Sequence, residues 1–512
     1  MLSAGSADSS LEELSVSAWF YRNRTIAGFD NPARSLYVSV RELVENALDA
    51  CEEARVLPEI SVSLQRESSL DDDEDLFAAG PQLYCLTVED NGTGICPENA
   101  PKLLGKMLTG TKYAQKQSRG TFGLGGALAL LYGQITTQNP IEIKTSKHGE
   151  PVGHKLVLQL DIEANEPIIL EETDFPKNQA GHGTTVSYHL KGDWLRSKRR
   201  IIDYFRQTSI IAPYASLRFE NPDDEHLVFK RVTSSLPDVP SEMKPHPEGI
   251  DLEMLKKMLN EAENRTLAGF LRSAFHRVGE VTAESLLEHC GLDAEKNPSD
   301  LTKAELKQLM RGIDTFEEFL PPSASALSPA GEEVLSAGIK RLEPQFFAVC
   351  QRKPSVYEGH PFIVEVGVAY GGEIEERLNL YRFANRIPLL YDEGSDVSNK
   401  VMRDLNLGNY DLDEQDKLAF FTHICSTQIP YKTVGKEYIG NVDSIRREID
   451  LGFKQCLRDI ATNVRRKHRA RRKRRRKNKL QQYYRFISST LSQSTSQEVS
   501  IESLFPQGEC KY

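Results

Sequence analysis

Three polar side chains of one predicted helix form a pattern that could do chemistry. Glu42, Asn46 and Asp49 stand at positions i, i+4 and i+7 of the stretch 41–50, so they share one face of the helix. A carboxylate and a carboxamide on one face can activate a water and hold Mg²⁺, a hard cation that prefers oxygen ligands. Taken alone, the same spacing also describes an exposed polar helix face.

The second pattern is the run Glu89-Asp90-Asn91-Gly92-Thr93-Gly94, which directly follows a predicted strand. A carboxylate at a strand end can accept a hydrogen bond from an exocyclic amine such as that of adenine. The glycines let the backbone turn sharply and approach a ring closely. Asn-Gly is also a strong hairpin signal, so this run by itself leaves a plain turn open.

Two glycine-rich runs complete the set. Residues 118–127 contain Gly-x-x-Gly-x-Gly-Gly and lead into the apolar stretch 128–131. A glycine-rich loop that opens a helix offers free N–H groups and the positive end of the helix dipole to phosphate. The run fits neither a Rossmann site nor a Walker A loop. Residues 180–187 form another glycine turn before an alternating strand, where a plain hairpin is the alternative.

The elements that hold these patterns follow from hydrophobic spacing. A helix is predicted over 36–55 and a strand over 82–89. An acidic loop, 71–75, lies between this helix and this strand. The stretch 91–126, which follows the strand, is expected to be a long loop. Long loops inside compact domains are usually functional, which fits the motifs found there.

Further along the chain, an all-helical stretch is predicted over 248–320, with a capping box at Thr302–Glu305. Mixed α and β structure follows, with apolar strands over 362–370 and 417–426. Apolar residues then recur every three or four positions from Ile445 to Val464, which predicts an amphipathic helix.

Composition narrows the class of protein. The chain has 512 residues, of which 39% are hydrophobic and 27% charged, close to ordinary globular usage. It has eight cysteines and no CxxC pair, which argues against a disulfide scaffold or a zinc ribbon. No apolar run reaches the roughly 18–20 residues that span a bilayer, and the N-terminus does not resemble a signal peptide. We therefore expect a soluble, intracellular protein without membrane contact.

One basic segment dominates the charge distribution. Twelve Lys or Arg lie between Arg465 and Lys479. Without them, 52 basic residues face 74 acidic ones, so the rest of the chain carries −22. The segment could bind DNA phosphates with strongly salt-dependent affinity, act as a nuclear localisation signal, or be a solvated helix end.

The order of the four patterns is more specific than any one of them. A helix with Glu and Asn, then Asp-x-Gly-x-Gly, then Gly-x-x-Gly-x-Gly, then Gly-Thr-Thr before a strand resembles the GHKL ATPase superfamily of gyrase, MutL, histidine kinases and heat-shock chaperones. Four further stretches resemble the B-subunit family of DNA topoisomerase VI, a type IIB enzyme, over about residues 17–460. They are residues 19–36, 105–113, 382–394 and 425–437.

This resemblance implies an α+β multidomain fold: a GHKL (Bergerat) ATPase α/β sandwich, a helix–two-turn–helix domain, a transducer of mixed sheet and helices, and a C-terminal basic helix. The expected boundaries are a flexible leader at 1–16, the ATPase at 17–235, the helical domain at 248–320, the transducer at 330–462, the basic helical tail at 463–487 and a disordered tail at 488–512.

The resemblance also assigns roles. Glu42 would be the general base, Asn46 would hold Mg²⁺, Asp90 would read the adenine amine, and Lys436 would reach the γ-phosphate, with Lys432 as the near alternative. The other nucleotide-binding residues implied are Asp49, Gly94, Thr111, Lys112, Gly120, Thr121, Phe122, Gly123, Leu124, Gly125, Gly126, Ala127 and Thr185. Some family members carry a lysine where this chain has Ala127.

The implied cofactors are ATP and Mg²⁺. The implied partners are double-stranded DNA, a second B chain that dimerises with ATP, and an A-type subunit carrying the tyrosine that cleaves DNA. The location would be the nucleus if the chain is eukaryotic and otherwise the cytoplasm or nucleoid. Two alternatives stand beside this one: a topoisomerase-VI-B-like scaffold of the meiotic break machinery without turnover, and another GHKL machine such as a chaperone or mismatch-repair ATPase.

Overall fold

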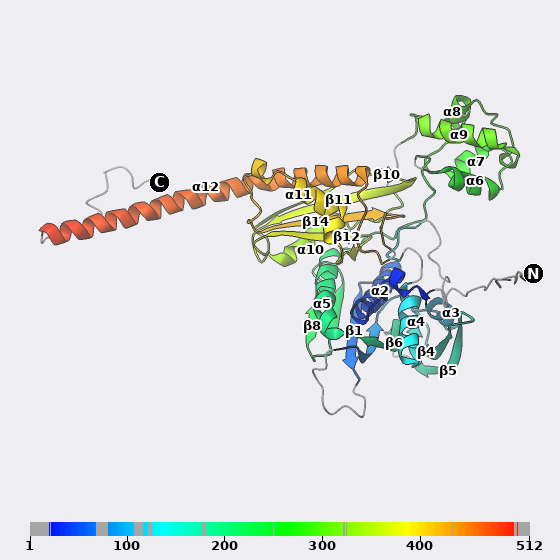
Figure 1. Ribbon diagram of the computed structural model, residues 1–512, viewed down its shortest axis with the longest axis horizontal. Coiled ribbons are helices and arrows are strands. Elements are labelled where there is room, and N and C mark those ends of the chain that lie inside the picture. The colour runs from blue at the N-terminus through cyan, green and yellow to red at the C-terminus, as the bar shows by residue number, and fades with distance from the viewer. Residues whose placement is uncertain are drawn as a thin grey trace, which may run out of the picture.

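The computed structural model describes residues 20, 22–67, 80–106, 116–120, 125–176, 181–248, 250–320, 323, 325–433, 435–495 and 499. These residues form three bodies and one projecting helix (Figure 1). We call them the N-terminal body (20–229), the helical body (250–320) and the C-terminal body (325–464), from which the last helix continues outward.

The N-terminal body is a sheet covered by helices. Its elements are η1 (Arg24–Ala27), α2 (Pro32–Glu53), β1 (Glu59–Arg66), β2 (Gln82–Glu89), α3 (Ala100–Gly105), α4 (Gly125–Thr137), β3 (Ile141–Ser146), β4 (Val152–Asp161), β5 (Glu166–Pro176), β6 (Gly183–Gly192), α5 (Trp194–Ile211), β7 (Ser216–Glu220) and β8 (His226–Phe229). The eight strands run in the order β5-β4-β3-β6-β2-β1-β7-β8. Neighbours are antiparallel except β1 and β7, which are parallel.

Local chemistry fixes where α2 begins. The Asn31 side chain accepts a hydrogen bond from the Arg34 N–H, and Pro32 occupies the first turn, where its missing N–H costs nothing. Helix α2 then buries most of its length, including the polar Arg41, Glu42 and Glu45. Buried charges require partners, so this helix has to be the centre of a polar site.

The helical body has its own apolar core, built around Leu255, Phe270 and Leu309. Its elements are α6 (Leu252–Asn260), α7 (Leu267–Ala274), α8 (Glu280–Cys290), η2 (Pro298–Asp300) and α9 (Lys303–Thr315). The capping box predicted at Thr302 and Glu305 is confirmed, with both reciprocal hydrogen bonds present. In Figure 1 this body stands apart from the other two.

The C-terminal body is a second sheet with helices. Its elements are α10 (Glu332–Ile339), η3 (Lys340–Leu342), β9 (Phe346–Gln351), β10 (Ser355–Tyr357), β11 (His360–Tyr370), β12 (Leu378–Ala384), β13 (Ile387–Pro388), η4 (Glu393–Ser395), α11 (Val397–Asp404), η5 (Leu407–Tyr410), β14 (Leu418–Ser426) and α12 (Asp443–Thr495). The strand order is β10-β11-β14-β12-β13, and β9 also pairs with β11, on the same edge as β10. The central strands β11 and β14 are buried along their whole length.

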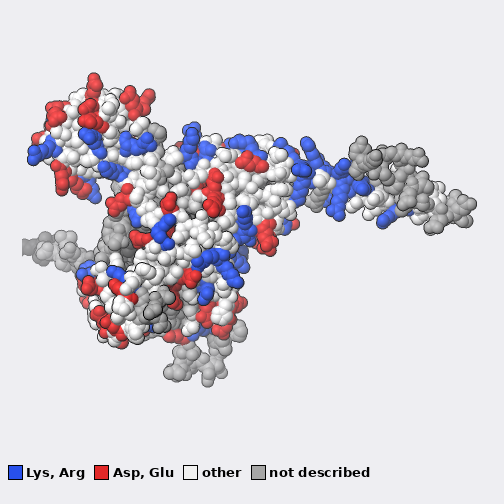
Figure 2. Space-filling model, turned by 180° about the vertical axis from the view of Figure 1, so that it is seen from behind, with Lys and Arg blue, Asp and Glu red and all other residues white. Residues whose placement is uncertain are grey.

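Helix α12 packs against the C-terminal body along its first half and projects from that body in its second half (Figure 1). The predicted apolar stripe from Ile445 to Val464 is confirmed. Six of its residues are each at most 1% exposed: Ile445, Ile449, Phe453, Cys456, Ile460 and Val464. Among the described residues none beyond Val464 is buried. The basic segment 465–479 begins beside the C-terminal body, where Arg465 pairs with Asp411 at 2.7 Å, and continues along the projecting part (Figures 1 and 2).

Two differences from the sequence predictions have local causes. The expected loop over 91–126 contains the short helix α3, which a proline in its first turn favours. Helix α12 runs past Ser488 to Thr495, so the predicted disorder from 488 is corrected for this stretch. Extending an existing helix needs only one hydrogen bond per residue, so Ser- and Gln-rich sequence can continue it. The predicted leader, residues 1–16, lies outside the described residues.

None of the described helices combines the length and the apolar composition needed to cross a membrane.

Candidate active site

The carboxylate of Glu42 is the centre of the candidate site. The residue is 6% exposed, and Arg41 Nη2 donates to its Oε1 at 2.5 Å. Its other oxygen faces the start of α4, where a Cβ added to Gly125 would lie 1.6 Å from Glu42 Oε2. Position 125 therefore has to be glycine for α4 to approach this carboxylate.

A lysine from the C-terminal body reaches the same carboxylate. Lys436 is buried, and its Nζ lies 3.5 Å from Glu42 Oε1 and 3.3 Å from Glu45 Oε2. Its backbone adopts the left-handed conformation at φ 53°, and Arg41 Nη1 donates to the neighbouring Gly435 carbonyl at 3.0 Å. Three residues of α2 thus hold a loop that lies nearly 400 positions away in the sequence.

The carboxyl group of Glu45, which faces Lys436, is shifted toward its neutral form because its pKa is raised. Burial raises the pKa of Glu45, while Lys436 and Arg41 oppose that rise. Lys432, the other lysine of this loop, is exposed and lies along Gly440 instead. The geometry thus brings Lys436 to the carboxylates and leaves Lys432 outside.

Asn46 lies one turn further along α2 and faces the next glycine. A Cβ added to Gly126 would lie 2.7 Å from Asn46 Nδ2. Gly125, Gly126 and Ala127 form the first turn of α4, whose leading N–H groups have no partner within the helix. The positive end of this helix therefore points toward the Glu42 and Asn46 face of α2.

Asp90 closes the site at the end of β2. Its Oδ1 accepts from the backbone N–H of Gly92 at 2.8 Å and of Thr184 at 3.3 Å. Burial raises the pKa of Asp90 to about 6, although these two hydrogen bonds oppose the rise. Gly183 has φ 134° and lies against the Asp90 carbonyl, where a Cβ would sit at 1.9 Å.

Gly94 is required by a close approach between chain segments. Its φ is 68°, and a Cβ there would lie 2.1 Å from the Ser146 carbonyl at the end of β3. The next residue, Ile95, donates its N–H to Thr145 Oγ1 at 2.7 Å. The glycine run therefore crosses over the ends of β3 and β6.

Position 184 rather than 185 faces the Asp90 side of the sheet. Side chains alternate along a strand, and in β6 Thr184, Val186 and Tyr188 are the buried ones. Thr185 therefore points to the opposite face, and Thr184 lies on the face of Asp90. Strand alternation, read from the buried Val186, was the signal that could have found it.

Asp49 is tied to the segment before the glycine-rich run. Arg119, 2% exposed, donates to Asp49 Oδ1 at 2.7 Å and to Glu52 Oε1 at 2.6 Å. Burial works against the charged guanidinium, but Glu52 and Asp49 hold the pKa of Arg119 well above its usual range. Asp49 thereby fixes the backbone that leads into Gly120.

The structure thus brings Glu42, Asn46, Asp49, Asp90 and Lys436 to one region. The first turn of α4 lies there as well, whereas Thr111, Lys112 and residues 121–124 lie outside the described residues. Sequence reasoning missed Arg41, Glu45, Thr184 and Arg119 as contributors. The spacing of Glu45, three positions after Glu42, was a usable signal, since it places both on one side of the helix.

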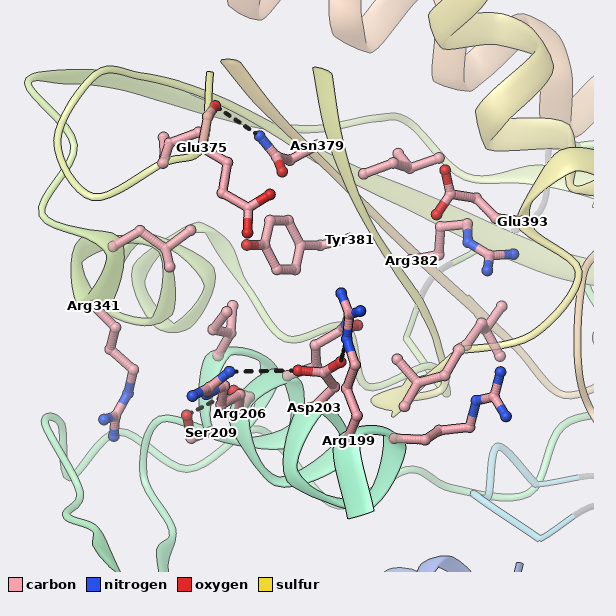
Figure 3. A pocket seen from close by; sticks show the side chains of 18 of the residues that line it. Arg199, Asp203, Arg206, Ser209, Arg341, Glu375, Asn379, Tyr381, Arg382 and Glu393 are labelled. Atoms are coloured by element: carbon pink, nitrogen blue, oxygen red, sulfur yellow. Dashed lines mark hydrogen bonds and ion pairs between the residues drawn. The ribbon is translucent and has the colours of Figure 1, made fainter. Parts of the chain in front are cut away.

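A second hollow, separate from this site, is a groove between α5 and the C-terminal sheet with a cavity volume of about 830 Å³. Figure 3 shows Arg199 and Arg206 both directed at Asp203 on α5, with Arg341 and Arg382 around the same hollow. The ion pairs to Asp203 are 3.8 Å and 3.5 Å long. Two guanidinium groups share this carboxylate, which leaves excess positive charge on the α5 side.

Comparison with known proteins defines the class. Residues 31–193 match the family model "Histidine kinase-, DNA gyrase B-, and HSP90-like ATPase", and residues 322–476 match "Topoisomerase VI B subunit, transducer". The fold and the site therefore define a GHKL ATPase joined to a transducer, and the predicted α+β architecture with its C-terminal long helix is confirmed.

The relatives specify the family. The B subunit of type 2 DNA topoisomerase 6 from Metallosphaera sedula is 41% identical over 91% of this chain and 86% of its own length. The protein of the same name from Saccharolobus solfataricus is 41% identical over 90% of this chain and 85% of its own. The chain belongs to the family of type 2 DNA topoisomerase 6 B subunits, the ATPase subunits of ATP-dependent type II topoisomerases.

Among solved structures, the 43K ATPase domain of Thermus thermophilus gyrase B, in complex with an aminocoumarin, overlaps with a TM-score of 0.38 at 13% identity. The overlap covers 90% of this chain and 98% of that one.

Proposed function

We propose that ATP binds between α2, the end of β2 and the first turn of α4. Asp90 accepts a hydrogen bond from the adenine amine, and the leading N–H groups of α4 receive the phosphates. Glu42 removes a proton from the water that attacks the γ-phosphate. This arrangement is supported by the close approach of α4 to α2, in which Gly125 lies against Glu42 and Gly126 lies against Asn46.

The donor set of this region fits Mg²⁺. Carboxylate and carboxamide oxygens are the hard ligands that Mg²⁺ prefers, and Asn46 stands beside the helix start that would face phosphate. Asn46 would hold the ion, whose chemistry is to neutralise charge on the phosphate oxygens.

The observation that carries the proposal is the position of Lys436. It belongs to the C-terminal body, yet its ammonium group lies between Glu42 and Glu45 of α2. A cation in that place can contact a γ-phosphate, so the ligand would join the two bodies. Loss of the γ-phosphate would release this contact, as in other nucleotide switches.

The partners follow from the family. ATP binding would favour dimerisation of two copies of this chain, and a separate A-type subunit would supply the tyrosine that cleaves double-stranded DNA. The excess of arginine around the α5 groove supports DNA contact near the junction of the bodies. In this arrangement ATP gates the passage of one duplex through another.

The test is ATP turnover by the purified chain, with and without supercoiled DNA and a cognate A-type subunit. Turnover that rises with both additions supports the gate. Nucleotide binding without turnover, even with both present, would favour the scaffold alternative, and absence of nucleotide binding would contradict the proposal.

Adenine-nucleotide affinity is expected to fall as the pH drops through about 6, the pKa of Asp90. Above that pH the carboxylate is ionised and both oxygens accept hydrogen bonds. Below it the carboxyl carries a proton and loses acceptor capacity toward the adenine amine. Calorimetric titration with ADP on either side of this pH measures the change.

The control for this titration is Asp90→Asn, in which the position no longer titrates. Ionisation of the ADP phosphates affects both proteins equally, so only the difference between them reports on Asp90. The same pH dependence in both would contradict the role of Asp90.

Deletion of residues 465–479 is expected to weaken DNA binding more at low salt than at high salt. Each phosphate interaction that the deletion removes should reduce the slope of log affinity against log salt by about 0.9. Fluorescence anisotropy with a labelled duplex at several salt concentrations measures this slope.

The matched control is deletion of the equally long stretch 480–494, which contains one basic residue, Arg485. An unchanged slope after deletion of 465–479 would favour a role of the segment in nuclear import over DNA contact.

A further inference from the structure

The turn between β12 and β13 carries an unusual pair of residues. Asn385 and Arg386 form the two-residue connection of this hairpin, in which Ala384 pairs with Ile387. Both have positive φ, 46° and 65°, and both are 5% exposed. Such turns favour Asn-Gly, because a left-handed conformation is strained for a residue with a long side chain. Strain of this kind persists where the surroundings fix the residue, and it clusters at functional sites.

The side chain of Arg386 reaches out of its own body. Its Nη2 donates to Glu52 Oε2 of α2 at 2.9 Å, and its Nη1 donates to Ser328 Oγ at 2.8 Å. Its backbone N–H donates to His423 Nε2 at 2.9 Å, which fixes the turn from behind. Arg386 therefore joins the C-terminal sheet to the last turn of α2.

The same turn contacts the segment that leads into Gly120. Asn385 Nδ2 donates to the Ser118 carbonyl at 3.1 Å. Glu52, which accepts from Arg386, also accepts from Arg119 at 2.6 Å. A third contact joins Gln117 to the Ser328 backbone through two hydrogen bonds of 2.8 Å and 2.7 Å. The C-terminal body thus holds residues 117 and 118 directly, and it is linked to Arg119 through the shared acceptor Glu52.

The two guanidinium groups of Arg119 and Arg386 keep the buried Glu52 carboxylate ionised. Burial works to raise the pKa of Glu52, but Arg119 and Arg386 outweigh it and hold that pKa below its usual value. Tyr214 also donates to Glu52 Oε1 at 2.5 Å. The carboxylate is therefore the shared acceptor of groups from three parts of the chain.

We propose that the Asn385–Arg386 turn positions the 116–120 segment, so that the phosphate-binding backbone is correctly placed only when the C-terminal body is seated on α2. Arg386 is a positioning residue that acts through Glu52 and Arg119. It is separate from Lys436, which reaches the Glu42 carboxylate directly. The inference rests on the proposed ATP site.

The substitution Arg386→Gly isolates this role. It converts the connection to Asn-Gly, the sequence that the turn geometry prefers, so the hairpin is retained while the guanidinium group is removed. We expect the dissociation constant of the full-length chain for a non-hydrolysable ATP analogue to rise about tenfold or more, the range for loss of hydrogen bonds to a charged group. The KM for ATP should rise in parallel while kcat changes little, because Glu42 is untouched.

Two further readouts separate positioning from simple stabilisation. Amide hydrogen exchange should increase in peptides covering 116–120 with the analogue present. Arg386→Lys, which retains a cation but cannot make both side-chain contacts, should fall between the wild type and Arg386→Gly in affinity. The matched control is Asp392→Gly, because Asp392 is another left-handed residue of this body but is exposed.

Affinity and exchange equal to wild type in Arg386→Gly would overturn the inference, whether or not its melting temperature changes. Should that variant not fold, wild-type affinity in Arg386→Lys would overturn it equally. If the wild-type chain binds no nucleotide, the proposed function fails instead, which keeps the two failures apart.

Discussion

Replacing Glu42 by alanine is expected to abolish ATP hydrolysis while nucleotide binding persists. The attacking water loses its general base, a loss that typically lowers turnover by about 10²- to 10⁴-fold. Asp90 and the first turn of α4, which we assign to the adenine and the phosphates, are unchanged. Steady-state turnover and calorimetric binding of the analogue, measured on the same preparation, check both halves of the expectation.

The control for this variant is Glu284→Ala on α8, because Glu284 is exposed and belongs to the helical body, which stands apart from the site (Figure 1). Its turnover should match that of the wild type. Retained turnover in Glu42→Ala would refute the assignment of the general base, and loss of binding would place Glu42 in nucleotide recognition instead.

Replacing Lys436 by methionine is expected to lower turnover by about 10²- to 10³-fold, the range for removing one group that stabilises charge in a transition state. ATP-dependent dimerisation should be lost with it, because the ligand would no longer join the two bodies. Turnover assays and analytical ultracentrifugation with the non-hydrolysable analogue measure the two effects.

Lys432→Met is the matched control, since Lys432 belongs to the same loop but is exposed. Removing Lys436 also leaves Glu42 and Glu45 with less positive charge nearby, so the melting temperature has to be followed in parallel. If Lys432→Met, and not Lys436→Met, reduced turnover and dimerisation, the assignment would move to Lys432.

The two expectations and the further inference meet on one helix. The middle of α2 contacts the C-terminal body through Arg41, Glu42 and Glu45, which hold the Gly435–Lys436 loop. Its last turn contacts the same body through Glu52 and Arg386. The C-terminal body thus touches α2 at both ends of the catalytic face. A shift of the C-terminal body would therefore displace Glu42, the proposed general base, and the phosphate-binding backbone together.

The helices and strands that carry the site were largely predictable from local sequence. The strand Gln82–Glu89 matches its predicted bounds, and α2 begins at Pro32, four positions before the predicted start. Asn31 and Pro32 specify that start by capping, which acts over one turn of chain. The capping box at Thr302 and the apolar stripe of α12 depend on equally local spacing.

The order of the glycine-rich patterns was likewise enough to predict an ATP site and the family. Glu42, Asn46, Asp49, Asp90 and the first turn of α4 were all predicted as candidates from residue type and spacing, and the structure brings them to one region. Each of these candidates lies on, or directly follows, a helix or strand that local sequence predicts. The pattern can therefore be recognised before the fold is known.

Tertiary structure alone decided which distant groups meet. The pairing of Glu52 with Arg386 joins residues 334 positions apart, and that of Glu45 with Lys436 joins residues 391 apart. Residue spacing within a helix or strand specifies its faces, but the contact between two faces depends on how the bodies pack, and that packing is set by burial summed over the whole chain.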